Sequence, residues 1–136
     1  MKYKYLEHTA DAKLQAYGKT LEQAFVNAAL GTFNIIFDPS KVKPKIRKKI
    51  QLTAKRDESL LYDFIDELLF LLDTEGFLLS KAEDMKISEG WSLSCTIFGD
   101  DFRNYDVQGN IKAVTYNDMF IKKKGQNYII QLVLDL

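Results

Sequence analysis

The sequence predicts an α+β fold, in which a single two-layer domain combines a mixed β-sheet of about seven strands with two main amphipathic helices. Two segments place apolar residues at helical spacing, and most other segments alternate apolar with polar residues, as strands with one buried face do. No repeat, low-complexity tract or linker interrupts the 136 residues, which is a common size for one domain. We therefore expect residues 1–136 to form one domain.

The N-terminal segment predicts two strands followed by a helix. Residues 3–7 and 12–17 alternate in polarity, and a polar turn at residues 9–11 joins them. Thr20 is a suitable N-cap because its side-chain oxygen can accept a hydrogen bond from the first helical turn. Apolar residues then recur at helical spacing over residues 21–36, so this helix should bury one face on the sheet.

The middle of the chain predicts a loop, a strand and the second helix. Both prolines lie in the loop at residues 38–44, and residues 46–54 keep a period of two with their basic side chains facing water. Asp57 or Ser59 is the expected N-cap of the second helix, and Gly76 is expected to end it. The buried stripe of this helix is expected to consist of Leu61, Phe64, Ile65, Leu68 and Leu72.

The C-terminal half predicts further strands over residues 77–88 and 91–98, and two more around a turn at residues 124–127. Residues 99–104, which are polar and acidic, are expected to form a surface connection. The last strand alternates strictly, so Asp135 lies on the face opposite to a row of large apolar residues, namely Tyr128, Ile130, Leu132, Leu134 and Leu136.

The composition restricts the class of protein. Lys plus Arg and Asp plus Glu both total 19, so the formal net charge is zero, and we expect any contact with RNA to run through a partner protein. No run approaches the roughly 18 apolar residues of a membrane span. Residues 1–5 lack the apolar core of a secretory signal, and the single Cys95 cannot form an internal disulfide. These features favour the cytoplasm and exclude a membrane partner.

The common catalytic motifs are missing from the sequence, which disfavours a stand-alone enzyme of a familiar type. There is no P-loop, no Gly-rich dinucleotide fingerprint, no HExxH, no CxxC and no nucleophile elbow. One histidine and one cysteine cannot form a zinc site of the usual nitrogen and sulfur kind. Any bound metal is therefore expected to have oxygen ligands, which favours a hard cation.

Two aspartates and the chain end are the candidate ligands. Asp11 alone fits a polar turn, where aspartate bonds the backbone, and an isolated His8 fits the same turn. Asp135 lies in an otherwise apolar strand, where it is either solvated at a sheet edge or in need of a partner, because an unpaired buried carboxylate is costly. Leu136 adds main-chain oxygens beside it, and Asp11 would supply a second carboxylate for calcium or magnesium.

Three other residues have an ordinary structural interpretation. Lys112 fits a solvated strand lysine, although a lysine held beside carboxylates or a phosphate is the functional alternative. Cys95 lies on the apolar face of its strand and is expected to be an inert part of the core. Trp91 is likewise expected to pack in the core.

Four stretches of the chain together resemble one family. They are YKYLEHTADAKLQAYGKTLEQAFVNAALGTF, DESLLYDFIDELLFLLDTEG, GNIKAVTYNDMFI and the final VLDL. In order, they contain the H-T-A-D element, an aromatic-Gly-x-[ST]-x-E-x-x-F entry into the first helix, an L-L-x-x-[FW]-[IL]-x-E-L-L helix, an I-K-A-[VI]-T-Y motif and a V-x-D-[IL] end. Each motif is weak alone, but the five in register make the chain similar to the archease family over nearly its whole length.

The resemblance implies a non-catalytic accessory protein for RtcB-type RNA ligases, which rejoin tRNA halves after intron removal. Archeases are understood to promote transfer of a guanylyl group onto the ligase's active-site histidine, so that the ligase turns over many times. An RtcB-type ligase is therefore the implied partner, and tRNA is expected to be contacted only indirectly, through that ligase. The missing catalytic motifs agree with this role.

The resemblance also implies the site residues. Asp11 of H-T-A-D and Asp135 of V-x-D-[IL] would hold a metal, together with the carbonyl or terminal oxygens of Leu136. Lys112 of the I-K-A-[VI]-T-Y motif is implied to be needed for activation of the ligase, with His8 neighbouring the cluster. Two carboxylates and main-chain oxygen suit Ca²⁺, with Mg²⁺ or another divalent cation as the alternative.

One position departs from the family pattern. Many members have histidine after T-Y, where this chain has Asn117. An amide can donate and accept hydrogen bonds but does not titrate near neutral pH, so any contribution of that histidine would differ here. The residues of the implied metal site are unchanged.

Two other functions remain open from the residues alone. The first is a chaperone or interaction module for RNA-processing proteins without a functional metal site. The second is a metal-dependent phosphohydrolase that uses the same oxygen ligands, which is disfavoured because no general base can be identified.

Overall fold

The structure is a computed structural model that describes residues 1–7 and 11–136. The role predicted for His8 therefore lies outside the described residues. In chain order the elements are β1 (Tyr3–Leu6), β2 (Asp11–Gly18), α1 (Leu21–Asn34), η1 (Pro39–Lys41), β3 (Ile46–Thr53), α2 (Asp57–Glu75), β4 (Phe77–Ser88), β5 (Ser92–Asp101), η2 (Phe102–Asn104), β6 (Ala113–Lys124) and β7 (Asn127–Asp135).

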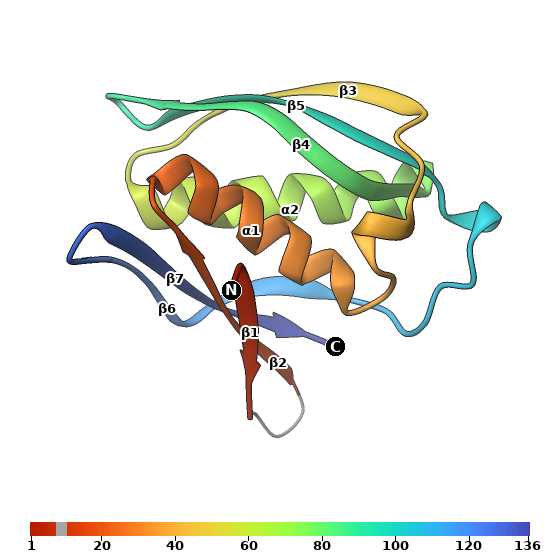
Figure 1. The fold of residues 1–136 in the computed structure, drawn as a ribbon, viewed down its shortest axis with the longest axis horizontal. Coiled ribbons are helices and arrows are strands. Elements are labelled where there is room, and N and C mark those ends of the chain that lie inside the picture. The colour runs from red at the N-terminus through yellow and green to blue at the C-terminus, as the bar shows by residue number, and fades with distance from the viewer. Residues whose placement is uncertain (8–10) are drawn as a thin grey trace.

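The described part of the chain forms the predicted α+β domain, with two α-helices and seven strands. The strands form two antiparallel sheets instead of one mixed sheet. Sheet A has the order β1-β2-β7-β6, and sheet B has the order β3-β5-β4. Hairpins join three strand pairs, which makes those pairs antiparallel. Helix α1 carries the chain from sheet A to sheet B, α2 connects β3 and β4 within sheet B, and the segment between β5 and β6 returns the chain to sheet A. Figure 1 shows both helices lying between sheet B above and sheet A below.

Helix α1 begins where the sequence predicts. The Thr20 side chain accepts a hydrogen bond from the Gln23 N–H at 3.1 Å, which satisfies one free amide of the first turn. On its buried side, α1 places alanines against sheet A, and Gly31 lies so close to Leu14 and Tyr3 that a side chain there would collide with both. The small residues therefore allow α1 to pack closely on β1 and β2.

Helix α2 begins at Asp57, and its N-cap is Arg56. The predicted caps are wrong because Asp57 and Ser59 lie inside the first turn. Ser59 still contributes, since its hydroxyl accepts from the Arg56 N–H at 3.2 Å and donates to the Arg56 carbonyl at 3.0 Å. Gly76 ends the helix as predicted, with a left-handed φ of 68°.

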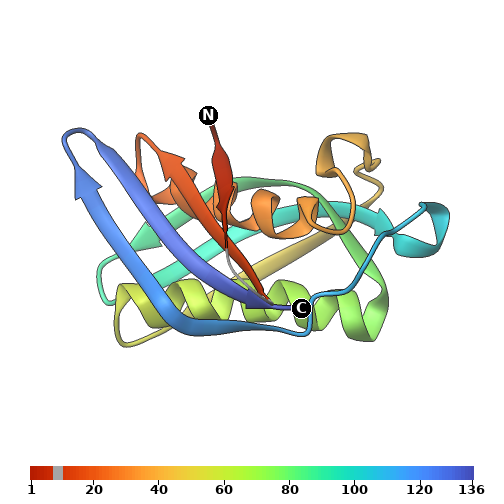
Figure 2. The ribbon, with the colours of Figure 1, turned by 90° about the horizontal axis from the view of Figure 1, so that it is seen from below.

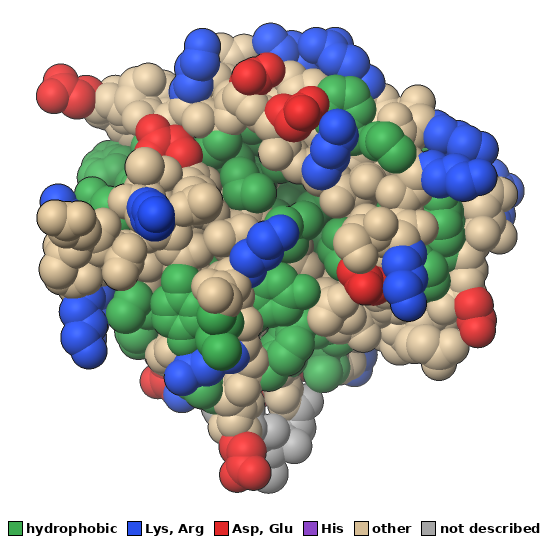
Figure 3. All heavy atoms as spheres, in the orientation of Figure 1, with side chains coloured by type: hydrophobic (Ala, Val, Ile, Leu, Met, Phe, Trp, Pro, Cys, Tyr) green, Lys and Arg blue, Asp and Glu red, His purple; other side chains and the backbone are tan. Residues whose placement is uncertain are grey.

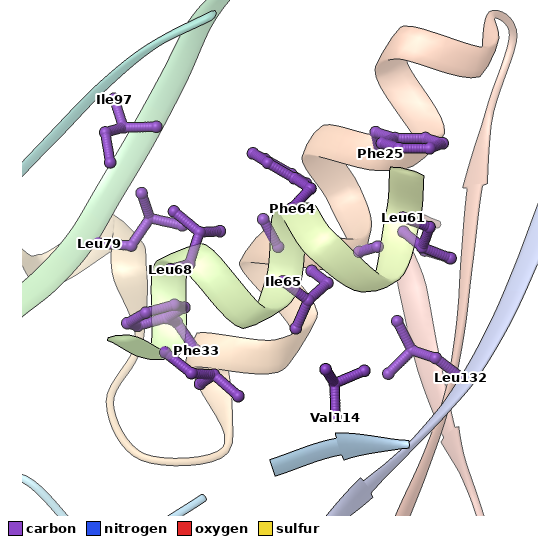
Figure 4. Packing of buried hydrophobic residues seen from close by; sticks show 14 of the residues in the cluster. Phe25, Phe33, Leu61, Phe64, Ile65, Leu68, Leu79, Ile97, Val114 and Leu132 are labelled. Atoms are coloured by element: carbon purple, nitrogen blue, oxygen red, sulfur yellow. The ribbon is translucent and has the colours of Figure 1, made fainter. Parts of the chain in front are cut away.

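The hydrophobic core lies between the two sheets and around both helices. Phe25 and Phe33 of α1 and Phe64 of α2 are fully buried. Figure 4 shows Val114 and Leu132 of sheet A on one side of α2, and Leu79 and Ile97 of sheet B on the other. The inward orientation of Leu132 sets the phase of β7, so Asp135 faces the outer side of sheet A.

Residues 99–104 form the predicted surface connection only from Phe102 onward, where the three residues of η2 are exposed. Strand β5 continues to Asp101, and the Asp100 side chain is only 4% exposed. It accepts hydrogen bonds from the Asp101 N–H at 2.8 Å and the Tyr105 hydroxyl at 2.9 Å. The sequence pattern could not show this because the covering residue comes from the segment after the strand.

The two residues predicted to be part of the core are packed as expected. Cys95 is buried, and its burial raises the pKa of the thiol to about 11, which makes it unreactive at neutral pH. Trp91 is half-buried and packs against the core. Neither helix in the described part of the chain combines the length and the hydropathy that crossing a membrane would require.

Candidate metal site

The two candidate aspartates face each other across neighbouring strands. Asp11 is the first residue of β2, Asp135 is the last residue of β7, and the two are cross-strand partners. Side chains directly opposite each other in an antiparallel pair lie on the same face, with Cβ atoms about 4.5–5.5 Å apart. Both carboxylates therefore project from the outer side of sheet A, where a shared cation could reach them.

Asp135 is exposed to solvent, although β7 is an interior strand between β2 and β6. Of the two alternatives for this residue, the solvated one holds, although at a strand end and not on an edge strand. Its exposure results from its position at the end of the strand. Figure 2 shows the C-terminus, the start of β2 and the segment leading into β6 meeting at one place.

Lys112 lies at the same strand end, directly before the first residue of β6. Its N–H donates to the Asp135 carbonyl at 2.8 Å, and the next residue, Ala113, is the cross-strand partner of Asp135. The Lys112 side chain is exposed, and Leu136 is 39% exposed. The fold thus brings Asp11, Lys112, Asp135 and Leu136 together from three segments that are far apart in sequence.

The donor set fits a hard cation. Within residues 1–7 and 11–136, no group of three or more His, Cys, Asp or Glu side chains could hold a metal ion. The two carboxylates would therefore act together with main-chain oxygens near Leu136. Calcium takes six to eight oxygen ligands, so such a site would leave positions for water or for groups from a partner.

A lysine that the sequence analysis did not select lies next to the two carboxylates. Lys13 is two residues after Asp11 and on the same face of β2. Its ammonium lies 3.1 Å from the Asp118 carboxylate, and its side chain is 21% exposed. The spacing of Asp11 and Lys13 could have indicated their shared face, but the approach of Asp118 could not be read from any spacing.

Asp118 reaches Lys13 because β6 is irregular. The register of β6 with β7 shifts between Thr115 and Phe120, and Asp118 has a left-handed φ of 53°. Extra residues in one strand make a bulge that redirects side chains. Tyr116, in the same bulge, stacks on Tyr62 of α2 with ring centroids 4.3 Å apart, which anchors the bulge to the helix.

A ladder of side-chain hydrogen bonds links the three strands next to the site. The Tyr17 hydroxyl donates to Gln15 at 3.0 Å, and the Gln15 amide donates to Gln131 at 2.8 Å. Gln131, which is 7% exposed, donates in turn to the Asp118 carbonyl at 2.8 Å. This ladder ties β2, β7 and the β6 bulge together and so positions Lys13 and Asp118 beside the carboxylate pair.

Position 117 is in the bulge too. The Asn117 N–H donates to the Thr115 hydroxyl at 3.3 Å, and the Asn117 side chain is exposed. The residue that departs from the family pattern is therefore at the surface, in the strand that directly follows Lys112.

Comparison with known proteins shows relatives along the whole chain. The family described as the Archease protein family (MTH1598/TM1083) matches residues 3–136. The protein archease of Saccharolobus islandicus is 40% identical, with 98% of each chain covered. The protein archease of Pyrobaculum neutrophilum is 39% identical, with 98% of this chain and 95% of the relative covered.

Two solved structures have a similar fold. The solution structure of Methanobacterium thermoautotrophicum protein 1598 gives a TM-score of 0.85 at 33% identity and covers 99% of both chains. The crystal structure of an archease, possible chaperone, from Thermotoga maritima gives a TM-score of 0.64 at 21% identity, with 98% of this chain and 96% of that chain covered. At that identity, the second likeness concerns the fold alone. From the family match and the relatives, the chain belongs to the archease family.

Proposed function

We propose that this protein is a non-catalytic accessory protein that activates an RtcB-type tRNA-splicing ligase. In this role it promotes guanylylation of the ligase and thereby its multiple turnover. We propose that it acts in the cytoplasm. Membership of the archease family supports the proposal. The observation that carries it is the meeting of Asp11, Asp135 and Lys112 at one solvent-exposed strand end.

The geometry suits action on a partner's reacting groups. An enzyme usually encloses its substrate and excludes water, whereas Lys112 and Asp135 are exposed. Guanylyl transfer develops charge on phosphate oxygens, and a positive charge aimed at them lowers the barrier. Lys112 would supply one such charge. Asp11, Asp135 and the main-chain oxygens of Leu136 would hold a divalent cation, Ca²⁺ in the first place, which would supply another.

Because the strand end is exposed, groups of the ligase could coordinate the same cation. Two carboxylates with main-chain oxygens do not fill the coordination of calcium. Lys13 adds a positive charge beside the carboxylates, which would weaken binding of a cation by the isolated protein. We infer that the cation is held more tightly when ligase groups complete its coordination.

A chaperone or interaction module without a functional metal site is the second candidate. The related Thermotoga maritima protein is described as a possible chaperone. In this chain, Phe70 on α2 is 57% exposed and Tyr116 is 47% exposed, although large apolar side chains are usually covered. These side chains offer an apolar contact surface that is independent of the carboxylate pair.

The experiment is multiple-turnover ligation of tRNA halves by an RtcB-type ligase with and without this protein. We expect more ligated product per ligase molecule when the protein is present. Asp11→Ala, Asp135→Ala and Lys112→Ala should each abolish the gain. Asp106→Ala and Lys124→Ala, which remove exposed charges away from the strand end, are the matched controls and should keep it. Unchanged turnover with the wild-type protein would refute the proposal.

A guanylylation assay separates the two candidates. Labelled GTP reports the fraction of ligase that carries the guanylyl group, and light scattering reports ligase aggregation under the same conditions. An activator raises the guanylylated fraction of ligase that is already soluble. A chaperone lowers the light scattering, and the triple variant at Asp11, Asp135 and Lys112 would then act as well as the wild type.

A further inference from the structure

The neutral net charge averages two oppositely charged segments. Residues 41–56 contain eight Lys or Arg and no Asp or Glu, whereas α2 directly after them contains seven Asp or Glu and no Lys or Arg. The structure separates most of these charges, because α2 lies between the sheets and, among the described residues, only Glu75 at its end forms an ion pair with a basic residue of β3, Lys48. Net charge alone therefore hides a basic surface.

The basic segment runs into β3, an edge strand of sheet B. In the central strand β5, Leu93, Cys95 and Ile97 are buried against the helices, so the alternating residues Thr96 and Phe98 face outward. We call this side the outer face of sheet B. Figure 3 shows Lys and Arg side chains gathered along the upper edge and the upper right, over sheet B and the segment leading into β3, with a few acidic side chains among them.

Cations flank both outward residues of β5. Phe98 is the cross-strand partner of Arg47 on β3 and of Lys81 on β4, and the Lys81 ammonium lies 5.0 Å from the centre of the Phe98 ring. Thr96 is paired with Lys49 on one side and Glu83 on the other. Thr96 is only 5% exposed, so the accessible part of this surface consists of the cationic side chains around the Phe98 ring.

The positive charge of this face is little neutralised within the protein. Glu83 lies 3.6 Å from Lys81, but both side chains are half-exposed, and exposed ion pairs of this kind contribute little. Lys48, which has the inward phase, pairs instead with Glu75 of α2. Among the described residues, neither Arg47 nor Lys49 forms an ion pair. Both are therefore available for an external anion.

We propose that the outer face of sheet B binds single-stranded RNA directly, through its phosphate backbone. Arg and Lys side chains are usual donors to phosphate oxygens, and the aromatic ring of Phe98 can stack on a base. An acidic protein surface is the competing ligand. Hot spots of protein interfaces lie in well-packed, desolvated pockets, whereas Phe98 lies on the face of a sheet between Arg47 and Lys81.

This surface is separate from the candidate metal site. Sheet A and sheet B lie on opposite sides of the helices (Figure 1), so both surfaces can be occupied at once. The inference goes beyond the proposed function, because net charge predicted that RNA is reached only through a partner protein, and the family resemblance implied that this partner is the ligase. It also stands without that function, since the binding surface contains none of the residues of the metal site.

The test is fluorescence anisotropy with a labelled single-stranded RNA of about 12 nucleotides, a length that one binding surface can cover. No ligase is present, so the outcome does not depend on the proposed function. The variant Arg47→Gln/Lys49→Gln removes two charges from the outer face of sheet B. The control Lys4→Gln/Lys124→Gln removes two exposed charges from β1 and β6 of sheet A. Thermal denaturation verifies that both variants are folded.

We expect the wild type to bind RNA with an affinity that falls steeply as salt rises from about 50 to 200 mM. Arg47→Gln/Lys49→Gln should bind about tenfold more weakly and should lower the slope of log affinity against log salt by about 1.4, since each phosphate contact to a single strand contributes about 0.7. The sheet A control should change the affinity less than about twofold by the same reasoning.

Phe98→Leu distinguishes RNA from an acidic protein, with polyglutamate as the competing probe. Loss of base stacking should weaken RNA binding by about tenfold and leave polyglutamate binding unchanged. Three results would overturn the proposal. They are no RNA binding at low salt, an equal loss in the sheet A control, or polyglutamate that competes as well as RNA while Phe98→Leu has no effect.

Discussion

Asp11 and Asp135, from opposite ends of the chain, are cross-strand partners at the end of sheet A. Two carboxylates held face to face repel each other, and a divalent cation between them relieves that repulsion. The proximity is created by the register of β2 with β7, in which eight successive residue pairs are aligned. A fixed register makes the separation of the carboxylates a property of the sheet and not of a flexible loop.

The first prediction concerns calcium binding. Asp135→Asn should lower the affinity for Ca²⁺ by about tenfold or more, because it removes one of two anionic ligands. Calcium should raise the melting temperature of the wild type and a chelator should reverse this, since a ligand that binds only the folded state stabilises it. Isothermal titration calorimetry and thermal denaturation measure the two effects. Asp106→Asn, at another exposed position, should behave as wild type, and an equal loss there would contradict the assignment.

The second prediction concerns Lys13. Residues two apart on a strand are separated by about 6.8 Å, and at about that distance in water a unit charge and a divalent cation repel each other by about 1.2 kcal/mol. Lys13→Gln should therefore bind Ca²⁺ about eightfold more tightly. Lys4→Gln on β1 removes the same charge farther from the carboxylates and is the control. Weaker calcium binding by Lys13→Gln would show that the lysine positions the site instead of opposing the ion.

The third prediction concerns the hydrogen-bond ladder beside the site. Gln131→Ala should destabilise the protein by about 1 kcal/mol, because it leaves the half-buried amide of Gln15 without its partner. A double-mutant cycle between Gln15 and Gln131, measured by urea denaturation, should give a coupling of about 1 kcal/mol. A control cycle between Gln131 and Gln51 of sheet B should give additive changes in the free energy of unfolding. Additivity in the first cycle would mean that the ladder does not stabilise the sheet.

The fourth prediction concerns the end of α2. Gly76 has a φ of 68°, and a Cβ at this position would come 2.7 Å from Cδ1 of Phe102. Gly90 has a similar φ of 77° with no atom within 4 Å of such a Cβ. Gly90→Ala should thus cost only the left-handed backbone, about 1–2 kcal/mol. Gly76→Ala should cost more, and equal melting temperatures for the two variants would show that the Phe102 ring moves freely.

The fifth prediction concerns acid stability. The Asp100 carboxyl accepts hydrogen bonds from the Asp101 N–H and from the Tyr105 hydroxyl, and both lower its pKa. Hydrogen bonds from Arg103 lower the pKa of the Asp101 carboxyl to about 2. A carboxyl whose folded pKa is lowered stabilises the fold fully above its unfolded pKa of about 4. That stability is lost as the pH falls from about 4 towards 2.

Urea denaturation across this pH range measures the effect. Asp100→Asn should be less stable than the wild type at pH 6 and should lose less stability on acidification, because it has one fewer carboxyl to protonate. Asp106→Asn, which alters an exposed carboxylate, is the comparison. A wild-type curve that is flat between about pH 4 and pH 2 would contradict the role of these two carboxyls.

The sequence alone determined those helix ends that depend on a residue and its immediate neighbours. Thr20 marks the start of α1, because its side-chain oxygen accepts a hydrogen bond from a free amide only three residues later. Gly76 marks the end of α2, because only glycine takes the left-handed backbone without cost. The start of α2 was missed because Arg56 is not a typical capping residue. The division into two sheets was missed because strand pairing depends on contacts between distant segments.

The same distinction applies to the candidate site and to the charged surfaces. The motifs identified Asp11, Lys112 and Asp135 one by one, and the family resemblance suggested that they act together. Only the tertiary structure decided that Asp11 and Asp135 face each other, since the β2–β7 register sets their alignment. It also decided that the β6 bulge brings Asp118 to Lys13. Net charge is a sum over the sequence, whereas a binding surface depends on where the fold puts each charge.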